Sequence, residues 1–187
     1  MDYVAQINAF TPGNQQEASD KRLIIELCHH FSHSILLREN EHAHITSSGF
    51  IVNRSLDKAL MVHHNIRNTW SWTGGHADGD PDLLGVAIRE AQEETGAALF
   101  TPLSDGIATV DVFDVGWHQR KSKDVCPHMH LSIAYLLIGD EDAHMHINPD
   151  ENTQVAWFPL DYFTQPHFDD YDVYLYNKLI DKARGAR

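Results

Sequence analysis

The sequence has little cysteine, little positive charge and no long hydrophobic run, and each shortage excludes a class of protein. Its 187 residues include two cysteines, Cys28 and Cys126, too few for a disulfide framework or a thiolate metal site. No apolar run approaches the roughly 18 residues that a membrane-spanning helix needs. The N-terminal segment MDYVAQINAF lacks the basic and apolar regions of a secretory signal. We therefore expect a cytoplasmic protein that does not act on a membrane.

Acidic residues outnumber basic ones, with 27 Asp and Glu against 14 Lys and Arg and a net charge of −13. A nucleic acid polymer or an anionic membrane surface would be repelled, because binding to either depends on Lys and Arg. A ligand that carries phosphate would need metal cations between it and the protein. The composition, with 42% hydrophobic and 22% charged residues, is typical of a folded globular domain.

Hydrophobic periodicity predicts one mixed α/β domain behind an N-terminal helix. Residues 11–18 are polar and contain Pro and Gly, so they are expected to form a loop; an amphipathic helix over 21–37 follows, capped by Ser19 or Asp20. Predicted strands cover residues 45–52 and 59–62 (as a hairpin), 108–115, 129–137 and 154–158, and a helical stripe runs from Leu175 to Ala183. We expect an N-terminal extension over residues 1–43 and one domain over 44–187 that ends with a helix.

A loop rich in Gly and Asp precedes a predicted helix that begins at Pro81 or Asp82 and ends at Thr95. Proline is favourable in the first turn of a helix, and Gly96 is a typical residue after the last turn. Its apolar side chains, expected to face the sheet, are Leu84, Ile88 and Ala91.

Three carboxylates, Glu90, Glu93 and Glu94, lie on one side of this helix by the 3.6-residue period. Like charges at these spacings repel one another, and a divalent cation would remove that cost. Oxygen ligands favour Mg²⁺ or Mn²⁺ over zinc. Arg89 precedes Glu93 by four residues, and its guanidinium is expected to orient one carboxylate of this set. The alternative is a solvated acidic helix face.

This stretch resembles the signature of the Nudix hydrolases, which is Gly, five residues, Glu, seven residues, then Arg-Glu-hydrophobic-any-Glu-Glu-any-Gly-hydrophobic. The register here runs from Gly75 to Ala97. One position departs, since Pro81 stands where the family usually has its first Glu, and Asp80 and Asp82 on either side are candidates to replace it. The likeness extends more loosely from the strand near residue 45 to the segment 157–161.

The resemblance implies an α/β/α sandwich around a mixed β-sheet, to which the N-terminal helix is an addition. It implies Mg²⁺-dependent hydrolysis of a diphosphate bond in a nucleoside diphosphate linked to another group X, with Mn²⁺ as the alternative ion and a small molecule as the partner. By the resemblance, the metal ligands are Glu90, Glu93, Glu94 and the Gly75 carbonyl, Glu93 takes part in activating water, and Arg89 is a positioning residue.

Two further sets of residues are candidates for the site. Glu151 and Asp150 precede the last short strand, in a loop that related enzymes use for a general base; the alternative is that both are solvated. His128 and His130 alternate on a strand, where they either face a substrate groove or have a structural or solvated role. On the first helix, two histidines at metal-ligand spacing lack a glutamate partner, which favours a solvated role.

Two other functions remain open. Pro81 in the signature motivates a Nudix-fold module that binds a nucleotide, or regulates, without turnover, while the intact carboxylate pairs favour an enzyme. An isomerase of the isopentenyl-diphosphate type ranks last, because neither Cys28 nor Cys126 lies where its catalytic cysteine is expected. The helix over 21–37 could cover a second copy of the chain, so a homodimer is also open.

Overall fold

The computed structural model describes residues 2–65, 68–104, 106–120 and 123–186. Its helices are α1 (Tyr3–Ala9), α2 (Gln15–Phe31), α3 (Leu83–Thr95) and α4 (Asp170–Gly185), with short 3₁₀ helices η1 (Ser32–Leu36) and η2 (Leu160–Tyr162). The strands are β1 (Ala43–Asn53), β2 (Lys58–His64), β3 (Thr69–Ser71), β4 (Thr73–His76), β5 (Thr101–Pro102), β6 (Thr109–Val115), β7 (His118–Arg120), β8 (Lys123–Val125), β9 (His128–Gly139) and β10 (Asn152–Pro159).

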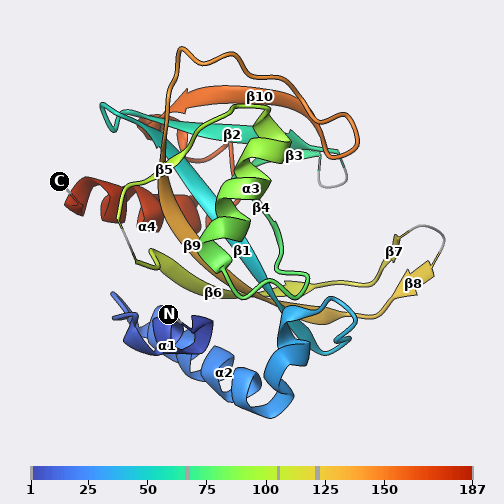
Figure 1. Cartoon of the computed structure of the whole chain (residues 1–187). Coiled ribbons are helices and arrows are strands. Elements are labelled where there is room, and N and C mark those ends of the chain that lie inside the picture. The colour runs from blue at the N-terminus through green and yellow to red at the C-terminus, as the bar shows by residue number, and fades with distance from the viewer. Residues whose placement is uncertain (1, 66–67, 105, 121–122, 187) are drawn as a thin grey trace.

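One mixed sheet forms the centre of the molecule, as expected from the sequence. Its main path runs β10-β2-β1-β9-β5, with β3 paired to β2, β4 to β1 and β6 to β9, while β7 and β8 form a separate ribbon. The long strands β1 and β9 are parallel, in register from Ala43 opposite Met129 to Asn53 opposite Gly139. The other strand pairs are antiparallel. Figure 1 shows α3 across one face of the sheet and α4 behind the other.

Alternate residues of β9 supply the two hydrophobic cores on the two faces of the sheet, as the period-two pattern predicted. Leu131 and Ile133 belong to the core beneath α3, which also contains residues of α1 and α2. Ala134 and Leu136 belong to the core beneath α4. The architecture is therefore the α/β/α sandwich expected from the sequence.

The N-terminal helices differ from the prediction. The helix expected over 21–37 begins at Gln15, because the Asn14 side chain accepts a hydrogen bond from the Glu17 N–H at 2.9 Å. Because α2 begins at Gln15, the predicted loop over 11–18 is wrong in its second half. The helix ends at Phe31, and η1 follows as far as Leu36. Helix α1 was not predicted, since a seven-residue helix offers too few turns for a clear stripe.

Helices α1 and α2 share the core and a buried charge cluster with the rest of the chain. Glu17 of α2 is fully buried, and its carboxylate pairs with Lys182 of α4 at 2.7 Å. Lys178, also on α4, lies between Glu17, at 3.7 Å, and Asp111 of β6, at 2.5 Å. The two ends of the chain are thereby joined through ion pairs whose acidic partners are buried.

Helix α3 matches its predicted bounds closely. The Asp82 side chain accepts a hydrogen bond from the Gly85 N–H at 3.1 Å, and the chain turns at Gly96 with φ +67°. Its predicted packed face is confirmed at Ala91, whereas Leu84 and Ile88 lie at the border of that face. Leu83, Val86, Ala87 and Ala91 are buried, whereas Leu84 and Ile88 are half-buried. Within the described part of the chain, no helix has the length and apolar character needed to cross a bilayer.

Candidate metal and active site

The double glycine lies in strand β4 rather than in the loop that the sequence suggested. Gly75 pairs with Ser47 of β1, and a Cβ on Gly75 would lie 2.3 Å from the Cδ atom of Glu90. Only glycine at this position lets the Glu90 carboxylate lie against the backbone of β4. The first proposed carboxylate ligand and the glycine of the signature are thus in contact, although 15 positions separate them in the sequence.

Glu94 lies deeper than a helix-surface residue, with 5% of its area exposed. Its Oε2 atom accepts a hydrogen bond from the Gly74 N–H at 3.0 Å. Glu90, one turn earlier in the helix, is half-buried, and Glu93, the residue next to Glu94, is exposed. The three carboxylates therefore occupy a graded series of environments, from solvent to the edge of the core.

Glu90, Glu93 and Glu94 form an acidic cluster whose negative charge is not fully balanced by nearby positive groups. Burial, with Glu93 and Glu151 nearby, raises the pKa of Glu90 to about 7. Burial raises the pKa of Glu94 to about 8, against the opposing effect of the Gly74 N–H, and Glu151 adds to the rise. A divalent cation would stabilise the ionised form of both groups.

Glu151, one of the two loop acids singled out from the sequence, is close enough to raise the pKa of both Glu90 and Glu94. Its backbone carbonyl accepts a hydrogen bond from the Asn65 N–H at 2.9 Å, and its Oε2 accepts one from Asn148 Nδ2 at 3.1 Å. The neighbouring Asn152 anchors the loop to α3 by donating to the Glu94 carbonyl at 2.8 Å.

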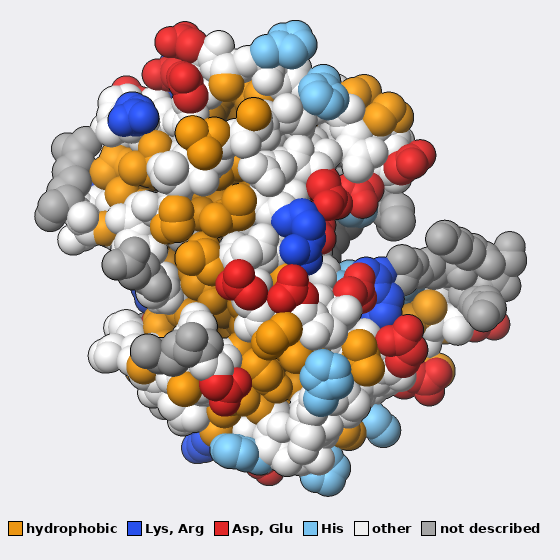
Figure 2. Space-filling view, in the orientation of Figure 1, with side chains coloured by type: hydrophobic (Ala, Val, Ile, Leu, Met, Phe, Trp, Pro, Cys, Tyr) orange, Lys and Arg blue, Asp and Glu red, His pale blue; other side chains and the backbone are white. Residues whose placement is uncertain are grey.

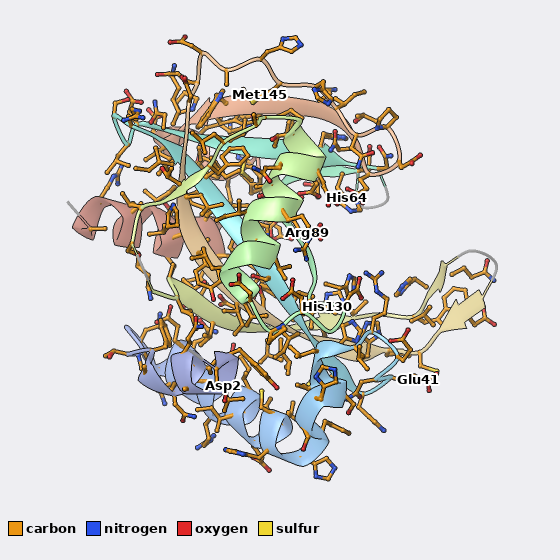
Figure 3. The ribbon with its side chains drawn as sticks, in the orientation of Figure 1. Asp2, Glu41, His64, Arg89, His130 and Met145 are labelled. Atoms are coloured by element: carbon orange, nitrogen blue, oxygen red, sulfur yellow. The ribbon has the colours of Figure 1, made fainter. Side chains whose placement is uncertain are left out.

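Arg89 makes its ion pair outside the three carboxylates, although its charge opposes the rise in the pKa of Glu90. Its Nη1 atom lies 3.2 Å from Oδ2 of Asp80, on the loop before α3, and the structure gives it no ion pair with Glu93. Asp82 is engaged as the helix cap, so both aspartates beside Pro81 already have partners on the protein. Figure 2 shows a basic side chain among acidic ones over α3, where Figure 3 labels Arg89.

The histidines of β9 have neighbours that the sequence did not indicate. His128 and His130 lie beside His44 of β1, and His130 also lies beside His76 of β4, with ring centroids 4.8 to 5.1 Å apart. His44 and His76 were missed because they come from strands whose pairing single-sequence spacing does not reveal. The histidines of α2 and η1 at metal-ligand spacing, His29 and His33, are both exposed.

The donors beside α3 fit a hard divalent cation. They are carboxylate oxygens, the type that Mg²⁺ and Mn²⁺ prefer, and the Glu90 carboxylate lies against Gly75, where a side chain would clash with it. The negative charge of the cluster is of the sign and density that such an ion needs.

A family model described as the NUDIX domain matches residues 43–177 of this sequence. The chain belongs to the Nudix family. A curated relative named "Probable DHNTP pyrophosphohydrolase", from Lactococcus lactis subsp. cremoris (strain MG1363), is 25% identical over 136 residues, which are 73% of this chain and 77% of the relative. The sequence-based identification of the family and of the enzyme class, a Nudix-type pyrophosphohydrolase, is thereby confirmed.

Solved structures of the Nudix family share the fold. A NUDIX hydrolase from Clostridium perfringens has a TM-score of 0.51 at 17% identity, covering 76% of this chain and 97% of that one. The MutT protein from Methanosarcina mazei Go1 has a TM-score of 0.50 at 22% identity, covering 78% and 96%. Nudix family enzymes generally act on small nucleotide derivatives and generally use a divalent metal as a cofactor.

Proposed function

We propose that this Nudix enzyme hydrolyses a diphosphate bond in a small nucleoside diphosphate derivative and that the reaction depends on Mg²⁺, with Mn²⁺ able to replace it. The observation that carries this proposal is the contact of Glu90 with Gly75, together with the hydrogen bond from Gly74 to Glu94. The contacts align two carboxylates of one helix along one strand. A diphosphate needs such a site, because the protein itself is acidic.

Four groups would hold the metal: the Gly75 carbonyl and the carboxylates of Glu90, Glu93 and Glu94. When bound, Mg²⁺ neutralises and polarises the diphosphate and lowers the pKa of a water molecule. Glu94 is held by the Gly74 N–H, so its carboxylate has one orientation before any ion arrives. This preorganisation lowers the cost of assembling the site.

Glu93 and Glu151 are our candidates for accepting the proton of the attacking water. Glu93 is exposed on the same side of α3 as the other carboxylates, which leaves it accessible to water and substrate. Glu151 is held by Asn148 and lies close enough to raise the pKa of Glu90 and Glu94. Arg89 is a positioning residue, because its guanidinium fixes Asp80 and with it the loop that enters α3.

The test is a substrate panel of nucleoside diphosphate derivatives with Mg²⁺ or Mn²⁺, read by the release of phosphate-bearing products. DHNTP belongs in the panel because the Lactococcus relative is named for it. We expect turnover by the wild type and a loss of about 100-fold or more in kcat for Glu93→Gln, which removes a charge without changing the shape of the side chain. Glu26→Gln, an exposed site on α2, is the control and should retain full activity.

The same panel distinguishes an enzyme from a binding module. A wild type that binds a nucleoside diphosphate derivative but releases no product with either metal would contradict the proposal. Pro81→Glu, which restores the usual carboxylate of the signature, would then be the informative variant. If Pro81→Glu cleaved the substrate and the wild type did not, this chain would be a binding module rather than an enzyme.

A further inference from the structure

Three histidines from three strands form a cluster that the reaction proposed above does not use. The possible ligand nitrogens of His44, His76 and His130 all lie within 4.8 Å of one another. The centroids of the three rings are 4.9 to 5.0 Å apart, so the rings form a nearly equilateral triangle. Figure 3 shows His130 below Arg89, near the place where β9 runs beside β1.

The register of the strands explains how these histidines meet. His44 of β1 is directly opposite His130 of β9, and His76 of β4 is opposite Thr46, two residues along β1. Residues two apart on a strand point to the same face of the sheet. All three side chains therefore extend from one face, and their strands hold them there.

This face is the one opposite the acidic cluster. A Cβ on Gly75 would point at Glu90 of α3, so the next residue of β4, His76, points to the other side of the sheet. Strand β4 thus separates two sets of donors. Oxygens lie on the α3 side, and imidazole nitrogens lie on the other.

His44 is prepared to act as a ligand. It is 3% exposed, and its Nδ1 atom lies 3.1 Å from the Asn40 carbonyl, to which it can only donate. The proton is then on Nδ1, and the lone pair is on Nε2. That Nε2 atom has no hydrogen-bond partner within residues 2–65, 68–104, 106–120 and 123–186. In metal-bound histidines, one ring nitrogen typically donates a hydrogen bond to a group such as a backbone carbonyl, and the other ring nitrogen binds the metal.

We propose that His44, His76 and His130 bind a Zn²⁺ ion, at a second metal site that is separate from the carboxylates of α3. Three imidazole ligands suit zinc, which leaves a fourth position for water or another ligand. Nitrogen donors select Zn²⁺ over Mg²⁺, and the oxygen donors across β4 do the reverse. The two sites therefore sort the two ions by ligand chemistry.

His128 supports this site as a positioning residue. Its Nδ1 atom lies 2.8 Å from the Cys126 carbonyl, so its Nε2 atom carries the lone pair. That atom is 3.2 Å from Nε2 of His130, and the contact holds the His130 ring beside His44. His76 and His130 are half-buried, which leaves space for the small ring rotations that close the ligands around an ion.

The experiment measures zinc binding directly. The full-length protein is stripped of metal with a chelator and titrated with Zn²⁺ by calorimetry in excess Mg²⁺, which occupies the carboxylates. We expect one equivalent of tight Zn²⁺ binding, a rise in melting temperature on binding, and with Co²⁺ the visible absorption of a tetrahedral complex with nitrogen ligands. Failure of the wild type to bind Zn²⁺ under these conditions would overturn the proposal.

The variants assign the ligands. His76→Gln and His130→Gln should each weaken Zn²⁺ binding by more than about tenfold and reduce the shift in melting temperature. His33→Gln, at an exposed position of η1, is the matched control and should bind like the wild type. Glu90→Gln should weaken Mg²⁺ binding and leave Zn²⁺ binding unchanged. Equal Zn²⁺ affinity in the double variant His76→Gln/His130→Gln, with its fold verified by circular dichroism in chelator, would refute the site.

Discussion

At the scale of single residues, the burial of Glu94 is the feature with the widest consequences. A carboxyl group that is 5% exposed loses most of its hydration when ionised, and this raises its pKa to about 8. Its ionisation in the native protein therefore requires compensation, which the Gly74 N–H supplies in part. Sequence periodicity placed Glu94 on the same side of the helix as Glu93, but it did not distinguish the buried residue from the exposed one.

We predict that the metal-free protein loses stability as the pH rises from about 5 to about 8. In this window the native state keeps the proton on Glu94 while the unfolded chain, with a pKa near 4.5, has lost it. Stability falls with rising pH wherever the unfolded state binds fewer protons. Glu90, whose pKa is raised to about 7, contributes in the same direction. The loss should be on the order of a few kcal/mol and is measured by urea unfolding in chelator.

The control for this prediction is Glu94→Gln, which retains an acceptor for the Gly74 N–H and does not titrate. Its stability should depend less on pH than that of the wild type, and Mg²⁺ at pH 8 should stabilise it less. Glu26→Gln should behave like the wild type. If Glu94→Gln shows the same slope as the wild type, the pH dependence comes from other groups, such as the general acidic charge of the chain.

At the scale of elements, α3 presents one face to the sheet and another to the metal. The inner face is formed by Leu83, Ala87 and Ala91, each of which is at most 2% exposed. The helical period predicted that the helix is two-sided, and that prediction is confirmed. The predicted inner residues Leu84 and Ile88 lie at the border of the packed face, because the direction of the helix across the sheet sets which residues are covered.

We predict that Leu83→Ala destabilises the protein by about 2 to 5 kcal/mol, the usual cost of truncating a buried leucine. Ile88→Ala should cost about 1 kcal/mol, because this side chain is half-buried and part of it already contacts water. Urea unfolding of both variants at one pH measures the difference. A larger loss for Ile88→Ala than for Leu83→Ala would mean that the helix is rotated relative to the structure described.

At the scale of the whole molecule, the N-terminal helices are tied to the C-terminal helix through buried charges. Lys178 is 6% exposed in its side chain and stands between Glu17 and Asp111, which are 0% and 1% exposed. Lys182 adds a second cation to Glu17. A buried cluster of this kind tolerates the removal of one partner poorly, since the opposite charge is left without compensation.

We predict that Lys178→Met destabilises the protein by roughly 3 to 5 kcal/mol. Lys58→Met is the matched control, because Lys58 forms an ion pair with Glu141 in which both side chains are more than a third exposed, at 42% and 35%. The control should cost less than about 1 kcal/mol. Thermal and urea unfolding measure both. Similar small losses in the two variants would show that the buried cluster contributes little to stability.

The sequence by itself determined the family, the bounds of α3 and most of the strands. These follow from short-range patterns: the spacing of the signature from Gly75 to Ala97, the cap at Asp82, the stop at Gly96 and the period-two alternation of β9. Each depends on residues within a few turns of one another. Local sequence therefore carries the information for them.

The tertiary structure alone decided which distant groups meet. It placed Glu90 against Gly75, brought Glu151 to the acidic cluster, and gathered His44, His76 and His130 on the opposite face of the sheet. These contacts depend on strand order and register, where a shift of one residue would turn every side chain to the other face. Nothing in the spacing along one chain specifies that pairing, because it arises when the sheet and its two cores assemble together.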